Sequence, residues 1–400
     1  MTEGEFPHGL PCPLAHPGEL VTERFSPLHQ THVDSGASFT DFAGWQMPVR
    51  YSSDLAEHHA VRSHAGIFDL SHMGEILVIG PEAAEALDYA LAGRLSAIEH
   101  GQAKYTLLLG RDGGVIDDLV VYRTGDDRFM VVANASNREV VVEELLQRTS
   151  PFDAEVEDES DDIALVAVQG PDALEILQQT PGFGVQGPGL DGDDFVSAVA
   201  GLKYYRSLPA EFEGGPVLIA RTGYTGEDGF ELYLAPERAE ALWSALRETG
   251  GSRLVPAGLA SRDTLRLEAG MPLYGHELGT DTFPAQAGLG RVVALGKEGD
   301  FVGREASERG PEEGARVLVG LIAEGRRAGR AGYAVFATTD AGEPVGEITS
   351  GALSPTLGHP IAMAYVAPDS AEPGTELYID VRGTRVAASV TALPFYKRRK

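Results

Sequence analysis

The sequence predicts an α+β protein with a large N-terminal region of two lobes and a small all-β module at the C-terminus. Between residues 74 and 271, segments with the alternation typical of β-strands are followed by segments with helical periodicity. After about residue 312, only short β-type segments at barrel-like spacing remain. We therefore expect an α+β region over 25–305 and a C-terminal β-barrel domain over 312–397, with the boundary in the polar stretch 302–316.

The first lobe is expected to contain a strand, a helix and a hairpin. A strand over 74–80 precedes a helix that starts at Pro81 and ends at Gly93, because proline suits the first turn of a helix and glycine the position after the last turn. Segments 104–110 and 114–125 flank the turn RDGG, which is the pattern of a β-hairpin.

The remaining elements repeat this order. Periodicity predicts a strand in 127–136, a helix over 137–149, a strand over 162–170 and a helix over 171–180. A strand pair then surrounds the turn YTGED, and two helices follow. These four elements cover 215–223, 229–236, 237–250 and 261–271.

The composition excludes several functional classes. The chain has 32 basic and 60 acidic residues and a net charge of −28, so phosphates of nucleic acids or anionic lipids would be repelled. No apolar run is long enough for a transmembrane helix. The single cysteine, Cys12, excludes a disulfide framework and a multi-thiolate metal site, and it fits a reducing cytoplasm. The acidity also favours a halophilic source, since salt screens repulsion between carboxylates.

Common nucleotide and metal motifs are missing from the sequence. It contains no GxxxxGK[ST], no GxGxxG after a strand and no HExxH. The segment with His58, His59 and His64 suggests a metal cluster at first sight. Adjacent helix residues point about 100° apart, however, so ordinary helix histidines are the favoured interpretation and no metal site is expected.

Three segments carry candidate functional side chains. Asp117 and Asp118 lie within an apolar strand, where alternation directs one carboxylate to each face and desolvation is costly without a function or firm hydrogen bonds. RTGYTGEDGFE (221–231) is a glycine-rich turn that leads into a strand at Glu231, and its glycines permit close approach of a ligand. The helix after 258 presents Arg262 and Arg266 on one face, either as a site or as salt-bridged surface.

Taken together, these segments resemble a known family. FAGWQMPVRY, EHHAVRSHAGIFDLSHMGE, GGVIDDLVVY, RTGYTGEDGFELY, GLASRDTLRLEAGMPLYG and the terminal PFYK occur in the order and spacing of the aminomethyltransferases, the T-proteins of the glycine cleavage system. The resemblance extends from about residue 25 to the C-terminus. It implies a three-domain cloverleaf around a central folate site. It also implies transfer of a methylene group from the lipoylated H-protein to tetrahydrofolate, the co-substrate, with no metal and no flavin.

The resemblance also assigns site residues. Asp118 corresponds to the essential aspartate of the family, with Asp117 as the alternative if the register differs by one. Glu231 resembles the pterin-binding carboxylate and Arg262 a second folate contact. Phe395 corresponds to an aromatic site residue that is tyrosine in some members. Three further residues lie in segments that line the folate pocket of the family: Tyr105, Asn134 and Tyr224.

Two other functions remain open at this stage. A folate-dependent demethylase would keep the fold and change the methyl or methylene donor. A non-catalytic folate-binding assembly factor would carry a cysteine in the glycine-rich turn, which here reads RTGYTGED. Two basic clusters are candidates for docking an acidic carrier protein, although ordinary solvated charge is the favoured interpretation of each. They are Arg326, Arg327 and Arg330, and the tail Lys397, Arg398, Arg399 and Lys400.

Overall fold

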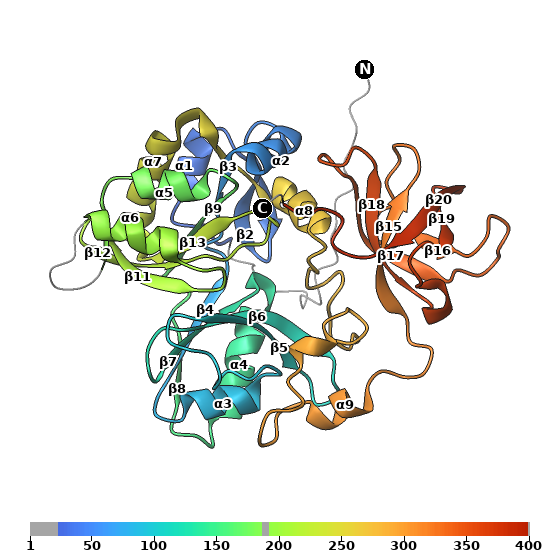
Figure 1. Cartoon of the computed structure of the whole chain (residues 1–400), viewed down its shortest axis with the longest axis horizontal. Coiled ribbons are helices and arrows are strands. Elements are labelled where there is room, and N and C mark those ends of the chain that lie inside the picture. Colours follow the sequence, from blue (N-terminus) through green and yellow to red (C-terminus); the bar gives the residue numbers. More distant parts are fainter. Residues whose placement is uncertain (1–22, 186–191, 399–400) are drawn as a thin grey trace.

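The computed structural model describes residues 23–185 and 192–398 and places three bodies around a common centre (Figure 1). The bodies are a seven-stranded sheet with its helices, a five-stranded sheet with its helices, and a closed six-stranded barrel. This arrangement confirms the expected α+β class and the C-terminal barrel. Cys12, the rest of 1–22, and Arg399 and Lys400 of the basic tail lie outside the described residues.

The seven-stranded sheet has helices on one face. Its order is β10 (Phe183–Val185), β11 (Ser207–Phe212), β12 (Gly215–Ala220), β13 (Gly229–Leu234), β9 (Ala164–Gln169), β3 (Ala65–Asp69) and β14 (Leu254–Pro256). The helices α1 (His29–Asp34), α5 (Ala173–Gln179), α6 (Gly192–Gly201) and α7 (Ala239–Gly250) belong to the same unit. Side chains such as Ile176, Phe195 and Trp243 bury this face in one apolar cluster.

The five-stranded sheet is built on the predicted hairpin. Its order is β5 (Ala103–Leu109), β6 (Val115–Arg123), β7 (Arg128–Ala133), β4 (Gly74–Ile79) and β8 (Glu155–Asp158). Two helices, α3 (Ala83–Ala90) and α4 (Arg138–Thr149), cover one face.

Alternation along β6 explains how the two sheets meet. Leu119 and Val121 point toward α3 and α4, whereas Val120 and Tyr122 point to the opposite face. That second face packs against Leu165 and Tyr233 of the seven-stranded sheet. The two sheets therefore share a core, and the candidate site lies in their interface.

The barrel attaches to this pair through helix α8 (Leu259–Glu268). Its strands are β15 (Val317–Ala323), β16 (Ala334–Phe336), β17 (Gly346–Leu353), β18 (Pro360–Val366), β19 (Glu376–Val381) and β20 (Thr384–Thr391). Leu267 of α8 packs against Ile361 and Met363 of β18. Three smaller elements complete the fold: the hairpin β1 (Ser38–Phe42) with β2 (Trp45–Arg50), α2 (Asp54–Ser63), and α9 (Arg304–Arg309).

The described helices include none with the length and apolar character that crossing a membrane requires.

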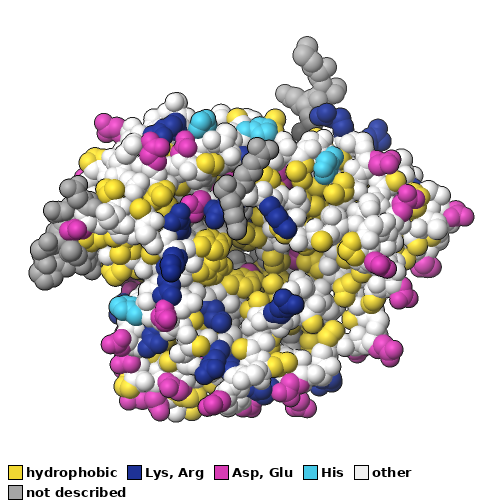
Figure 2. All heavy atoms as spheres, in the orientation of Figure 1, with side chains coloured by type: hydrophobic (Ala, Val, Ile, Leu, Met, Phe, Trp, Pro, Cys, Tyr) yellow, Lys and Arg dark blue, Asp and Glu magenta, His cyan; other side chains and the backbone are white. Residues whose placement is uncertain are grey.

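Acidic side chains are spread over the visible face of the molecule, mostly toward its periphery (Figure 2). We expect the melting temperature to rise as salt is increased from about 0.1 M to about 1 M, because the screening length falls from about 10 Å to about 3 Å and the repulsion within a net charge of −28 weakens. Thermal melts in sodium chloride test this expectation. An unchanged melting temperature would contradict the halophilic interpretation and leave the enzymatic one untouched.

Candidate functional site

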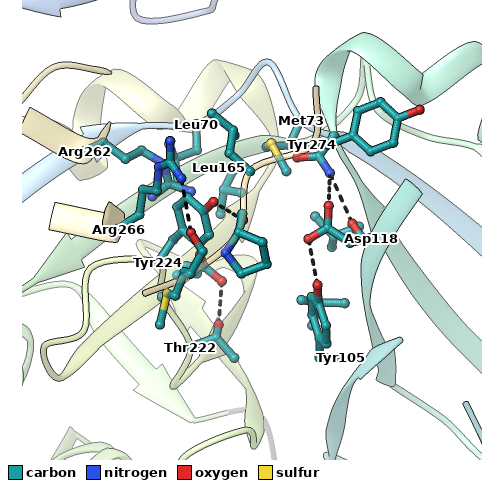
Figure 3. A pocket seen from close by; sticks show the side chains of 18 of the residues that line it. Leu70, Met73, Tyr105, Asp118, Leu165, Thr222, Tyr224, Arg262, Arg266 and Tyr274 are labelled. Carbon is teal, nitrogen blue, oxygen red and sulfur yellow. Dashed lines mark hydrogen bonds between the residues drawn. The ribbon is translucent and has the colours of Figure 1, made fainter. Parts of the chain in front are cut away.

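A cavity of about 360 Å³ opens where the two sheets and α8 meet. It corresponds to the hollow at the centre of Figure 2, which is lined largely by hydrophobic side chains. Asp118 and Tyr105 lie on one side of it, and Arg262 and Tyr224 lie on the other (Figure 3). Six of the seven residues expected from the sequence line this cavity: Tyr105, Asp118, Asn134, Tyr224, Glu231 and Arg262.

The two aspartates of β6 have different surroundings, as alternation predicts. Asp118 lines the cavity and accepts a hydrogen bond from the Tyr105 hydroxyl at 3.0 Å. Asp117 is fully buried and accepts hydrogen bonds from the backbone N–H of Asn134 and from the Asn137 side chain. The Asn134 amide donates to both carboxylates, at 2.8 Å to Asp117 and 3.0 Å to Asp118. Asn134 therefore holds Asp118 in place, with Asp117 as the buried anchor.

Burial sets the protonation of this pair. Removal from water raises the pKa of both carboxyls above the usual aspartate range, and the charge of Asp118 raises the pKa of Asp117 further. The bonds from Tyr105 and Asn134 oppose the rise at Asp118 because they favour its ionised form. Such a pair is able to take up or release a proton near neutral pH.

Glu231 is oriented by a row of hydroxyl groups behind the cavity. Thr222 donates to its Oε2 at 2.5 Å, and the hydroxyls of Tyr122 and Tyr233 lie 3.4 Å from the same oxygen. Tyr122 and Thr222 are themselves joined at 2.9 Å. Since these contacts all involve Oε2, Oε1 is the oxygen with the greater capacity to accept hydrogen bonds from a ligand.

Helix α8 supplies two arginines with different roles. Arg266 is buried and ion-paired with Glu277 at 2.9 Å, and it also donates to Ser350 of the barrel. Arg262 lies with its guanidinium 5.0 Å from the centroid of the Tyr224 ring. Its Nη1 is enclosed and has no hydrogen-bond partner among the described residues. Arg266 is therefore held by protein groups, whereas Arg262 has no ion pair among the described residues and lines the cavity.

The glycine-rich turn before β13 requires its glycines. A Cβ at Gly223 or Gly229 would collide with the Gln169 side chain, which donates to the Thr222 carbonyl at 3.0 Å and accepts from Thr225 at 3.0 Å. The amide of Gln169 thus ties the first half of the turn to β9 at two points. This is how the turn is fixed closely enough to position Glu231.

The two other acids of the turn are structural. Glu227 pairs with Arg62 of α2 at 3.0 Å, and Asp228 pairs with Arg221 at 2.5 Å. Both carboxylates are thus neutralised by ion pairs with nearby arginines. Of the three acids in RTGYTGEDGFE, only Glu231 lines the cavity.

Phe395 is the one expected site residue that does not line the cavity. Its side chain packs in an apolar cluster with Leu267 and Met363 between α8 and the barrel. Burial of this ring in the apolar cluster stabilises the contact between α8 and the barrel. Tyr396, the next residue, stacks over the Arg62 guanidinium at 4.1 Å.

Sequence reasoning missed several lining residues: Phe42, His72, Tyr205, Thr222 and Tyr274. His72 carries a visible signal, since it is a histidine in the short segment LSHM between the two apolar strands β3 and β4. Phe42 and Tyr274 come from segments whose sequences show neither the helical nor the strand pattern of hydrophobic residues. Only tertiary packing brings these two residues to the cavity.

His58 of α2 and His64, the residue that follows α2, each contact protein groups. His58 contacts Thr264 at 2.7 Å and Glu268 at 3.2 Å, and the exposed His64 contacts Asp172 at 3.0 Å. Across residues 23–185 and 192–398, no group of three or more His, Cys, Asp or Glu side chains is arranged to hold a metal ion.

Comparison with known proteins gives a consistent result. Residues 28–297 match the family model "GCVT N-terminal domain", and residues 316–397 match "Glycine cleavage T-protein C-terminal barrel domain". A relative from Cutibacterium acnes named Aminomethyltransferase is 60% identical over 379 residues, which is 95% of this chain and 100% of the relative. An Aminomethyltransferase from Streptomyces coelicolor is 56% identical over 383 residues, covering 94% and 98% of the two chains.

A solved structure agrees with the sequence relatives. The crystal structure of glycine cleavage system aminomethyltransferase T from Bartonella henselae superposes with a TM-score of 0.83 at 38% identity. The superposition covers 94% of this chain and 99% of that one.

Proposed function

The chain belongs to the aminomethyltransferase family of glycine cleavage T-proteins and is an aminomethyltransferase, and we propose that its central cavity binds tetrahydrofolate and admits the aminomethylated lipoyl arm of a separate H-protein. The observation that carries the proposal is the meeting of Asp118 and Glu231, from two different sheets, at one cavity. The single cysteine favours a reducing cytoplasm as the place of the reaction.

The reaction is a transfer without net oxidation or reduction. Bonds from the methylene carbon to N5 and N10 of tetrahydrofolate form, and the bonds of that carbon to the lipoyl sulfur and to the amino nitrogen break. The two protons lost from the folate nitrogens end on the sulfur and on ammonia. The protein must therefore hold the two substrates together and provide for proton movement.

Glu231 fits the pterin edge of tetrahydrofolate. The 2-amino group and N3–H are adjacent donors, and a carboxylate is the side chain that accepts from both. The hydroxyls of Thr222, Tyr122 and Tyr233 gather at Oε2 and leave Oε1 toward the ligand. Arg262 lines the same cavity, and its guanidinium supports a second contact, to an acceptor on the same co-substrate.

Asp118 is proposed to act on the reacting groups. An ionised carboxylate in a largely apolar cavity stabilises an iminium-like cation, and its raised pKa allows it to receive a proton near neutral pH. Tyr105 and Asn134 position Asp118 through their hydrogen bonds, and Tyr224 contributes its ring to the wall beside Arg262. No covalent enzyme intermediate is required.

Glu231→Gln is expected to weaken tetrahydrofolate binding about 5- to 150-fold. The substitution replaces one acceptor by a donor that faces a donor, which costs about 1–3 kcal/mol. Isothermal titration calorimetry measures the effect, with Glu227→Gln as a control because Glu227 lies in the same turn but outside the cavity lining. Unchanged affinity in Glu231→Gln would remove Glu231 from the binding site.

The defining assay supplies aminomethylated H-protein and tetrahydrofolate and measures ammonia and methylenetetrahydrofolate. Formation of both products is the expected result. Turnover of a methylated donor without the lipoyl carrier would instead identify a folate-dependent demethylase. The glycine-rich turn has no cysteine, which argues against the assembly-factor alternative.

Charge at the cavity mouth supports docking of an acidic carrier. Lys and Arg side chains surround the central hollow in Figure 2, while acidic side chains lie mostly farther out. Within the basic tail, Arg398 lies 3.3 Å from Asp228 of the glycine-rich turn. The second cluster (Arg326, Arg327 and Arg330) follows β15 on the barrel, with all three residues exposed. We propose the tail, whose Arg398 reaches the cavity-forming turn, as the more favourable docking element of the two.

A further inference from the structure

The charged side chains of the central cavity are divided between its two sides. Among the described residues, Arg262 and Arg266 are the only Lys or Arg side chains that line it, and both lie on one side (Figure 3). Asp118 lies on the opposite side, together with Tyr105 and Tyr274. That side offers a carboxylate and two phenol rings, which is a suitable environment for a positively charged group.

Tyr274 contributes to the cavity wall with its ring. It packs against an apolar cluster that includes Leu107 and Leu278, and it also lines the cavity. The residue is only half-buried despite this packing. The part of the ring that the cluster does not cover is therefore available to a ligand in the cavity.

The segment that carries Tyr274 is held in place on both sides of this residue. The hydroxyl of Tyr224 donates to the carbonyl of Pro272. The backbone N–H of Leu273 donates to the carboxylate of Glu277 at 2.9 Å. These bonds fix the segment after α8, so the ring is placed before a ligand arrives and little ordering is needed on binding.

The methylene donor carries a positive charge next to the carbon that is transferred. It is an S–CH2–NH3+ unit, and the iminium derived from it is also a cation. An aromatic ring attracts a cation placed over its face, and the attraction is stronger where water is excluded, as in a largely apolar cavity. Burial and the charges of Asp117 and Asp118 raise the pKa of Tyr274 above its usual value, so the phenol stays neutral at physiological pH.

We propose that Tyr274 is a donor-binding residue, whose ring face holds the cationic aminomethyl group of the lipoyl arm beside Asp118. The inference rests on the proposed function, because it takes the aminomethylated lipoyl arm as an occupant of the cavity. Arg262 lies on the opposite side, so its contact with the co-substrate does not depend on Tyr274. A change at Tyr274 should therefore affect the donor much more than tetrahydrofolate.

Two substitutions separate the ring from the hydroxyl group. Tyr274→Phe keeps the ring, whereas Tyr274→Leu keeps an apolar side chain and removes the ring face. We expect kcat/KM for aminomethylated H-protein to fall about tenfold or more in Tyr274→Leu and to stay within about threefold in Tyr274→Phe. The affinity for tetrahydrofolate, measured by calorimetry, should stay within about threefold in both variants, which a general distortion of the cavity would not allow.

Phenylalanines with one, two or three ring fluorines at position 274 test the ring face directly. Fluorine withdraws negative charge from the face of the ring with little change of shape, so kcat/KM should fall stepwise from the value of Tyr274→Phe. A series without a trend would overturn the inference, even if Tyr274→Leu does not fold.

The remaining outcomes separate this inference from the function on which it rests. If the wild type does not turn over aminomethylated H-protein, the proposed function itself is wrong. If the wild type is active and Tyr274→Leu is equally active, only the role of Tyr274 is overturned. Equal losses in Tyr274→Phe and Tyr274→Leu would overturn the assignment to the ring, because they would place the contact at the hydroxyl group.

Discussion

Asp118→Asn is expected to lower turnover about a hundredfold or more while leaving the affinity for tetrahydrofolate nearly unchanged. Asparagine keeps the shape of the side chain and a hydrogen bond with Tyr105, so the cavity retains its form. It removes the negative charge and the proton-accepting group, which together commonly increase the rate of the chemical step by about two to four orders of magnitude. Steady-state kinetics with aminomethylated H-protein, combined with calorimetry of the co-substrate, measure the two effects separately.

The pH dependence of turnover gives an independent check on Asp118. Burial raises its pKa above the usual aspartate value of about 3.9, so the ionised form is lost as the pH falls through a higher range than usual. The acid limb of the wild-type kcat profile should therefore lie clearly above pH 4. That limb should be absent from the residual activity of Asp118→Asn. A wild-type profile that is flat down to pH 4 would argue against an ionised Asp118 in the reaction.

Asp117→Asn is the matched comparison. Asp117 accepts three hydrogen bonds from Asn134 and Asn137 and is fully buried. Its replacement should therefore affect the stability of the fold more than the rate of the reaction. We expect a lower melting temperature with a smaller loss of kcat than in Asp118→Asn. If Asp117→Asn is the more severe catalytic defect, the assignment of the two aspartates must be exchanged.

The elements with a strong period were predictable from the sequence. The hairpin of β5 and β6, the strand–helix pairs and the closed barrel all follow from alternation, helical periodicity and turn residues. The same alternation separates Asp117 from Asp118. The local sequence pattern sufficed for these predictions because each of them depends only on which face of one strand or helix is apolar.

The remaining features depend on contacts between distant segments. His72 meets Phe42 across a sequence separation that no local pattern encodes, and Phe395 is directed to the barrel by the apolar surface of α8 and β18. Pairing of Arg266 with Glu277, and of Arg62 with Glu268, likewise appears only in the folded chain. A sequence shows which side chains carry charge, but the partner that neutralises each buried charge is determined by tertiary packing.

Glu268 joins three parts of the molecule that must stay aligned for the site to exist. It lies at the end of α8, the helix that also carries Arg262, and its side chain is fully buried. Its carboxylate pairs with Arg62 of α2 at 2.9 Å. On the barrel side it accepts hydrogen bonds from the Ser354 hydroxyl at 2.5 Å and the Thr356 backbone at 3.0 Å.

The pKa of Glu268 reflects these contacts. Burial alone would raise it, but the bonds from His58 and Ser354 and the charge of Arg62 lower it from 4.5 to about 2. A carboxyl with a depressed pKa in the folded state stabilises the fold above its unfolded pKa. That stabilisation is lost as the pH falls from about 4.5 toward about 2.

Glu268→Gln is therefore expected to lower the free energy of unfolding by about 3–5 kcal/mol at pH 7, because it leaves the Arg62 charge buried with only Glu227 to balance it. The difference between wild type and variant should narrow as the pH is lowered toward 2, since protonation of Glu268 removes the same charge from the wild type. Urea unfolding at several pH values measures both effects. Glu175→Gln is the control: Glu175 pairs with Arg253 at 3.1 Å but is 55% exposed in its side chain, so its loss should cost less than about 1 kcal/mol. Equal effects of the two substitutions at pH 7 would show that the Glu268 pairs do not hold α8 between α2 and the barrel.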